Sequence, residues 1–165
     1  MKNESLQRRL VRVFSKQGIT LATAESCTGG LIAKLVTDVP GSSSVLLGGC
    51  VTYTNDVKIN LLGVDPSVIE RDTEVSHTCA RAMARGARER IGATVGVSTT
   101  GYAGPTGGTE RDPVGTVYIA VSTEKCTVGE RFCAPLGSTR TQVRNAAAQR
   151  ALELVLSLAE NPNNL

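Results

Sequence analysis

The chain has 165 residues, a length typical of one domain that buries enough surface to fold without a metal ion or a disulfide. Hydrophobic residues make up 41% and charged residues 20% of the sequence, which excludes disorder, collagen and coiled coil as descriptions of the whole chain. The net charge is only +3 and aromatic residues make up 3%, so the composition disfavours a nucleic-acid-binding surface and is better suited to a small anionic ligand.

Residue spacing predicts helices and strands that alternate along most of the chain. Asn55 and Ser138 are the expected caps of two of these helices, and the pair Gly48–Gly49 suggests a bulge or a close backbone approach within a strand. The tail over 161–165 is expected to be frayed. In chain order, the predicted elements are a helix over 4–17, a strand over 19–23, a helix over 31–39, a strand over 45–55, helices over 56–63, 66–71 and 77–91, a strand over 93–99, strands over 116–122 and 126–133, and a helix over 139–159.

The alternation predicts an α/β fold, and we expect one domain over 1–165. The two late strands are expected to form a hairpin, which predicts a mixed sheet that is mostly but not purely parallel. Ligands in such folds usually bind at the carboxyl ends of parallel strands. Three loops should lie there, over 25–30, 53–58 and 100–116, and we expect the functional site among them.

Targeting signals and cysteine pairs are not apparent. No apolar run approaches the ~20 residues that a membrane span needs, and the N-terminus lacks the apolar core of a signal peptide. The five cysteines are an odd number without CxxC spacing, so reduced thiols are expected. We therefore expect a cytoplasmic protein that binds neither a membrane nor a nucleic acid.

The first loop, AESCTGG, contains candidate nucleophiles. Ser26 is placed where a strand turns toward a helix whose first N–H groups can stabilise an oxyanion. The alternative is that Ser26 or Thr28 only caps that helix. Cys27 is a second candidate nucleophile, but His77, the single histidine, is far along the chain and near a helix start, so a Cys–His pair is disfavoured.

The second loop contains a candidate base. Tyr53 and Lys58 are five positions apart, and Lys58 is expected in the first turn of a helix, where the helix dipole disfavours its charge and lowers its pKa. A lysine with a lowered pKa can accept the proton of a serine hydroxyl. The alternative is an ordinary surface lysine.

The remaining two elements can bind an anion. The glycine-rich loop over 101–115 can present backbone N–H groups to a phosphate, although it has neither the P-loop ending nor GxGxxG spacing. Arg140 and Arg144 are four positions apart and lie on one helix face, where they can hold a phosphate or a carboxylate. A solvated basic face is the alternative for this arginine pair.

Taken in order, these elements resemble the CinA C-terminal domain family, which includes stand-alone nicotinamide-nucleotide amidohydrolases (PncC-type NMN deamidases). The resemblance covers essentially the whole chain and rests on ESCTGG, on VTYTN-x-x-K, on GxAGPxGGT-x-x-x-PVGTV and on the closing TRTQVR. It implies a three-layer α/β/α fold, no metal or organic cofactor, and hydrolysis of nicotinamide mononucleotide to nicotinic acid mononucleotide and ammonia. A homo-oligomer is also expected, with the small apolar residues of 77–91 as a possible interface.

The same resemblance implies roles for individual residues. Ser26 would be the nucleophile, Lys58 its base and Tyr53 an assisting group, while Arg144 would bind phosphate or hold the loop. Two departures concern substrate preference: Tyr102 stands where relatives more often have a small aliphatic residue, and Ser138–Thr139 replaces Gly-Asp. The other residues that the resemblance assigns to the substrate pocket are Glu25, Thr28, Gly29, Thr100, Gly101, Ala103, Gly104, Gly107 and Arg140.

Two other kinds of function remain open at this point. The same loops could bind a pyridine nucleotide without catalysis, in which case purified protein would bind nicotinamide mononucleotide and release no ammonia. The glycine-rich loop could instead contact a protein partner in a competence-related assembly. The low charge and few aromatic residues argue against direct DNA binding, which would be sensitive to salt.

Overall fold

The structure is a computed structural model that describes residues 4–160. The tail over 161–165, which the sequence predicts to be frayed, lies outside the described residues. The helices are α1 (Leu6–Gln17), α2 (Leu31–Thr37), α3 (Asn55–Leu62), α4 (Pro66–Asp72), α5 (His77–Ile91) and α6 (Arg140–Ala159), with a short 3-10 helix at Ser42–Ser44. The strands are β1 (Leu21–Glu25), β2 (Leu46–Val51), β3 (Val95–Gly101), β4 (Thr116–Ser122) and β5 (Thr127–Cys133).

The predicted elements are all present, but two helix caps are displaced. Thr54, and not Asn55, caps α3, and its hydroxyl accepts the Val57 N–H at 3.4 Å. Thr139, and not Ser138, caps α6 in a capping box with Gln142. In both cases the capping residue has the extended backbone that a cap requires. Helix α3 therefore starts one residue earlier than predicted, and α6 starts one residue later.

The five strands form one mixed sheet in the order β2-β1-β3-β4-β5. Strand β1 pairs in parallel with both β2 and β3, whereas β4 pairs antiparallel with β3 and with β5. Only β4 therefore runs against the other four strands. The expected mixed and mostly parallel sheet is confirmed, and so is the hairpin formed by β4 and β5.

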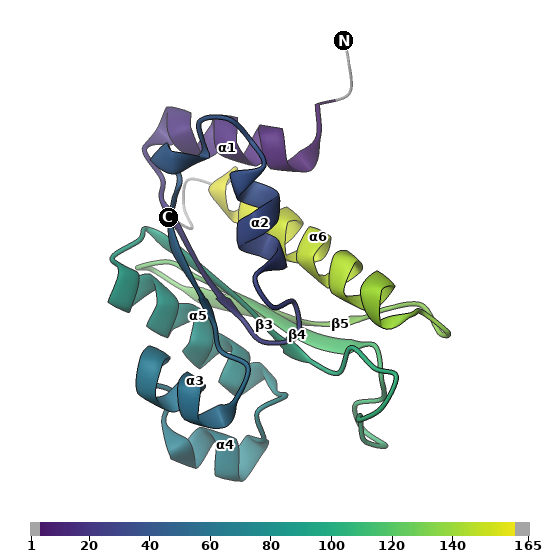
Figure 1. The fold of residues 1–165 in the computed structure, drawn as a ribbon. Coiled ribbons are helices and arrows are strands. Elements are labelled where there is room, and N and C mark those ends of the chain that lie inside the picture. The colour runs from purple at the N-terminus through teal and green to yellow at the C-terminus, as the bar shows by residue number, and fades with distance from the viewer. Residues whose placement is uncertain (1–3, 161–165) are drawn as a thin grey trace.

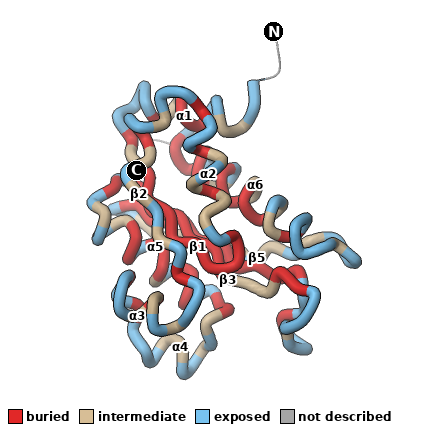
Figure 2. Tube along the Cα trace, viewed as in Figure 1, coloured by how far each residue is buried: buried red, intermediate tan, exposed pale blue. Residues whose placement is uncertain are grey.

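Helices cover both faces of the sheet and give three layers (Figure 1). Helices α1, α2 and α6 lie on one face, and α3, α4 and α5 lie on the other. The central strands β1, β3 and β4 are almost entirely buried (Figure 2), because each has a helical layer on either side. Residues that form the core under α1, α2 and α6 include Leu10, Phe14, Leu21, Ile32, Val97, Ile119, Leu152 and Val155.

Helix α5 does not offer the interface that its small residues suggested. Cys79, Met83 and Ala87 pack against β1 and α3, and Ala80 and Ala84 pack against β4. All five side chains are buried within the chain itself, so a partner subunit has no access to them. That part of the prediction is wrong because a helix whose apolar face packs on a sheet has the same sequence pattern as one that packs on a second subunit.

The Gly48–Gly49 pair marks both features that the sequence suggested. The register of β2 against β1 shifts between Leu46 and Gly48, which leaves Leu47 as a bulge. A Cβ atom at position 49 would lie 2.4 Å from the Thr23 Oγ1, so only glycine fits there. Within the described residues, no helix combines the length and the hydropathy that crossing a membrane requires.

Candidate active site

The site forms where the three adjacent parallel strands end. Glu25, the last residue of β1, is in register with Val51 of β2 and Thr99 of β3. The ladder continues for one residue on each side, since the Ser26 N–H donates to the Thr99 carbonyl and the Thr52 N–H donates to the Glu25 carbonyl, both at 2.9 Å. Strand register therefore places Ser26 beside the end of β3, as the position of the three loops predicted.

The side chain of Lys58, in helix α3, contacts Ser26. Its Nζ donates to the Ser26 Oγ at 3.2 Å and to the Thr52 carbonyl at 2.9 Å. The Lys58 side chain is 1% exposed and Ser26 is 9% exposed, so water hardly competes for this contact. Burial lowers the pKa of Lys58, which makes its neutral form more accessible than that of a surface lysine.

Glu25 secures the loop that carries Ser26. The buried carboxylate accepts the Thr28 hydroxyl at 2.7 Å and the N–H groups of Gly30, Ile32 and Ala33 at 3.1, 3.0 and 2.9 Å. It therefore occupies the N-terminus of α2, whose N–H groups the sequence analysis had expected to face a ligand. That expectation is wrong because a buried glutamate in the preceding strand satisfies these groups first.

Two arginines of α6 have different contacts. Arg144 donates from Nε to the Cys27 carbonyl at 3.1 Å and from Nη2 to the Thr28 carbonyl at 2.8 Å, so it holds the loop that carries Ser26. Arg140 donates to the Gly104 carbonyl at 2.7 Å and to the Tyr53 hydroxyl at 2.9 Å. Only Arg140 lines the cavity, which makes it the arginine better placed to meet an anionic group of a ligand.

A cavity of about 190 Å³ opens above Ser26 and Lys58. It contains seven of the predicted site residues, and Tyr53 lies at its mouth with 59% of its surface exposed. The predicted residues that line the cavity are Ser26, Tyr53, Lys58, Thr100, Gly101, Ala103 and Arg140. The predicted residues that do not line it are Glu25, Thr28, Gly29, Gly104, Gly107 and Arg144.

The predicted residues outside the cavity have structural contacts of their own. Thr28 is fully buried, and its hydroxyl lies 2.7 Å from the Thr99 hydroxyl as well as from Glu25. Gly29 has a φ of +60°, which favours glycine, and a Cβ there would meet the Arg144 guanidinium at 3.4 Å. Thr28 and Gly29 therefore support the conformation of the loop and do not line the cavity. A sequence motif alone does not distinguish these two roles.

Cys27 and His77 do not form a catalytic pair. Burial raises the pKa of the Cys27 thiol to about 12, so the thiolate is scarce near neutral pH. His77 is exposed at the start of α5, and its ring packs edge-on against Tyr118 with 4.7 Å between the ring centres. The geometry therefore favours Ser26 over Cys27 as the nucleophile.

Sequence reasoning missed two acidic residues. Asp112 braces the glycine-rich loop, since its carboxylate accepts the Tyr118 hydroxyl and the Arg131 Nε, both at 2.9 Å. Glu74 lines the cavity, and its carbonyl accepts the Thr100 hydroxyl near the end of β3 at 2.7 Å. Neither residue stands in a motif of its own. The signal that could have identified Asp112 is its place in a loop with five glycines, which needs side-chain contacts to hold one conformation.

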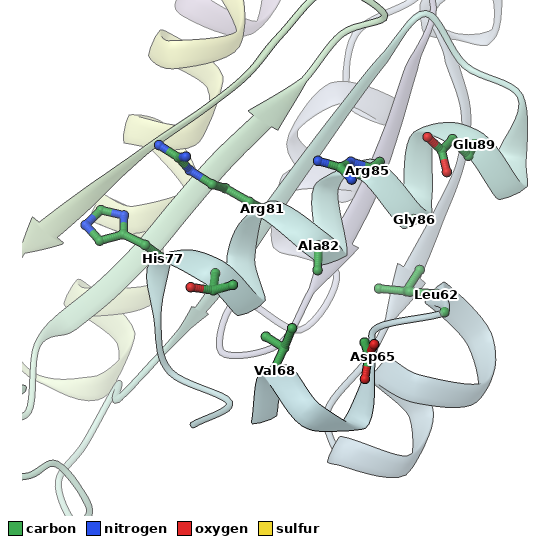
Figure 3. Close-up of a pocket in the computed structure, with 11 residues that line it drawn as sticks. Leu62, Asp65, Val68, His77, Arg81, Ala82, Arg85, Gly86 and Glu89 are labelled. Carbon is green, nitrogen blue, oxygen red and sulfur yellow. The ribbon is translucent and has the colours of Figure 1, made fainter. Parts of the chain in front are cut away.

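A second and larger pocket, of about 440 Å³, lies beside α4 and α5 (Figure 3). Arg81, Arg85 and Glu89 project from α5 along it, and Asp65 and Val68 lie across from them. It contains no serine or lysine, so the Ser26–Lys58 arrangement has no counterpart here. Among residues 4–160, no group of three or more His, Cys, Asp or Glu side chains gathers closely enough to hold a metal ion.

The chain is similar to known proteins over most of its length. The chain is 46% identical to a CinA-like protein of Acidobacterium capsulatum and 47% identical to one of Myxococcus xanthus, in each case over 93% of this chain. It spans only 37% and 36% of the length of those relatives. Such similarity indicates common descent of this chain and the part of each relative that it matches.

Solved structures agree with the fold. The competence/damage inducible protein CihA from Agrobacterium tumefaciens superposes with a TM-score of 0.88 at 40% identity, covering 92% of each chain. A competence-damaged protein (CinA) superfamily protein from Escherichia coli gives 0.88 at 33% identity, covering 93% of this chain and 88% of that one. The profile of the CinA C-terminal domain matches residues 3–159, so this chain belongs to the CinA C-terminal domain family.

Proposed function

We propose that this chain hydrolyses the carboxamide of nicotinamide mononucleotide to nicotinic acid mononucleotide and ammonia, as a step of pyridine-nucleotide recycling. The observation that carries the proposal is the buried contact of 3.2 Å between the Lys58 Nζ and the Ser26 Oγ. Amide hydrolysis needs a nucleophile with a base in hydrogen-bond reach, and a lysine with a lowered pKa supplies that base near neutral pH.

The proposed first step acylates Ser26. Neutral Lys58 accepts the proton of the Ser26 hydroxyl while the Oγ bonds to the carboxamide carbon. The resulting ammonium then donates this proton to the departing nitrogen as the C–N bond breaks and ammonia leaves. Water hydrolyses the ester in the second step, with Lys58 again accepting a proton and returning it to the Ser26 Oγ.

Oxyanion stabilisation must come from groups that are not already bonded. The Glu25 carboxylate uses the first N–H groups of α2, and the Ser26 N–H donates to Thr99. The Cys27 N–H donates to no other residue among 4–160, and Cys27 lines the cavity. We assign the oxyanion contact to this N–H, which directly follows the nucleophile in the chain.

Charge at the cavity mouth supports a phosphorylated substrate. The Arg140 guanidinium lies between the Tyr53 hydroxyl and the glycine-rich loop, where it can pair with a phosphate. The test is ammonia release by purified protein supplied with nicotinamide mononucleotide, nicotinamide riboside or nicotinamide. We expect the rate to fall in that order, whereas binding of the mononucleotide without ammonia release would contradict hydrolysis and favour a binding module.

A further inference from the structure

The proposed active site has an acidic wall that the hydrolysis steps do not use. Glu74 lies in the segment between α4 and α5 and lines the same cavity as Ser26 and Lys58. Its carboxylate makes no ion pair or hydrogen bond with any residue from 4 to 160. Glu74 acts on Lys58 through its charge but forms no ion pair with it, so the carboxylate is available to a cationic ligand in the cavity.

The backbone around Glu74 is held in an unusual conformation. Thr73 has a φ of 70°, which is rare for a β-branched residue, and its hydroxyl donates to the Val75 carbonyl at 3.2 Å. Ser76 donates to the Thr73 carbonyl at 2.9 Å, and Thr100 donates to the Glu74 carbonyl at 2.7 Å. Three side-chain hydrogen bonds thus hold the backbone of this segment in the conformation that places Glu74 at the cavity.

An aromatic ring accompanies the carboxylate. Tyr102 lines the cavity, and a Cβ at Gly107 would lie 3.4 Å from its ring, so the ring covers that glycine. Burial raises the pKa of Tyr102, and the nearby negative charge of Glu74 raises it further. Tyr102 also packs in the same cluster as Val75, the residue after Glu74, and Glu74, Tyr102 and Arg140 all line the one cavity.

This pair has the chemistry of a cation subsite. Aromatic faces attract cations, and a carboxylate adds direct charge attraction that partial burial preserves. A pyridinium ring that carries a substituent on its nitrogen has a permanent positive charge at every pH, whereas free nicotinamide is neutral near pH 7. We propose that Glu74 and Tyr102 form the subsite for a pyridinium ring and restrict the site to N-substituted nicotinamides.

The inference deepens the proposed function, because it takes the carboxamide as the reacting group. The carboxamide would lie at Ser26, the charged ring between Glu74 and Tyr102, and the phosphate at Arg140. Its test is nonetheless independent of turnover, since it measures binding. A failure of ammonia release would thus contradict hydrolysis alone, and a failure of charge discrimination would contradict this subsite alone.

The experiment compares two ligands that lack ribose and differ in ring charge. Dissociation constants of 1-methylnicotinamide and nicotinamide are measured by NMR titration of the full chain. We expect wild type to bind the charged compound roughly tenfold more tightly, which corresponds to about 1.4 kcal/mol. Glu74→Gln, which keeps the size of the side chain, should abolish this preference while leaving the affinity for neutral nicotinamide unchanged.

Tyr102 variants supply the matched control. Tyr102→Phe should keep the preference for the charged ring, and Tyr102→Leu should reduce it, with folding of each variant checked by circular dichroism. Equal binding of the two compounds by wild type would overturn the proposal. So would a Glu74→Gln variant that loses affinity for nicotinamide mononucleotide but keeps its affinity for 1-methylnicotinamide, because Glu74 would then contact the ribose.

Discussion

The amine of Lys58 lies 3.2 Å from the hydroxyl of Ser26, although 32 positions separate the two residues in the chain. Ser26 directly follows strand β1, and Lys58 lies in helix α3, which follows strand β2. The same amine donates to the Thr52 carbonyl, which fixes its direction. The proposed nucleophile and its proposed base are therefore brought together at two adjacent strand ends of one sheet.

Removing the amine should abolish most of the activity. We expect Lys58→Ala to lower kcat for nicotinamide mononucleotide by at least roughly 100-fold, the range for loss of a general base. Lys34→Ala is the matched control, since Lys34 is an exposed lysine of α2 that pairs with Asp38 just after the helix. Steady-state ammonia release measures both variants, and a loss of only twofold in Lys58→Ala would contradict the assignment of the base.

The pH profile should report the state of Lys58. Only its neutral form can accept a proton, so kcat/KM should rise with pH through the pKa of this residue and level off beyond it. Burial lowers that pKa, so the midpoint of this rise should lie below the ordinary lysine value of 10.5. The groups that oppose this shift are Cys79, Glu74 and Cys27, and Cys79 and Cys27 are themselves protonated near neutral pH.

Loss of the Glu74 charge therefore has a predictable sign. Glu74→Gln should lower the pKa of Lys58 further and move the acidic limb of the same profile to lower pH. A limb that stays in place, or moves to higher pH, would mean that the titrating group is not Lys58 or that Glu74 does not act on it.

Arg140 and Arg144 should give opposite phenotypes. Arg140→Ala should raise KM for nicotinamide mononucleotide more than for nicotinamide riboside, because only the former carries phosphate. Arg144→Ala should instead lower kcat for both substrates and destabilise the fold by about 2 kcal/mol, since it loses two charged hydrogen bonds to the loop. Kinetics and urea denaturation measure the two effects, and an exchange of these phenotypes would contradict the assignments.

Thr52 offers a way to stabilise the site. Its Oγ1 is buried without a hydrogen-bond partner in the described part of the chain. Thr52→Val keeps the shape and the carbonyl that binds Lys58, so it should raise the free energy of unfolding by about 1 kcal/mol. Thr28→Val is the control and should be destabilising by about 2 kcal/mol, because its hydroxyl contacts Glu25 and Thr99. Thermal unfolding that ranks the variants in the other order would be evidence against this view.

The sequence could predict that Ser26 and Lys58 lie in one site, because their positions depend on where strands end. Ser26 and Lys58 follow predictable strands, and parallel strands bring their carboxyl ends together. The roles of Arg140 and Arg144 could not be separated, since their contacts depend on how α6 is rotated against the nucleophile loop. The role of Glu25 was predicted wrongly and Glu74 was not predicted at all, for a related reason. What a carboxylate binds depends on neighbours that the fold brings from distant positions in the chain.

The central claim is that the hydroxyl of Ser26 attacks the carboxamide. Its most direct test is ammonia release from nicotinamide mononucleotide by Ser26→Ala beside wild type, with binding of the nucleotide measured on the same samples. We predict that the variant binds the nucleotide, keeps its fold and releases ammonia no faster than buffer alone. A folded Ser26→Ala protein that turns over at the rate of wild type would contradict the account.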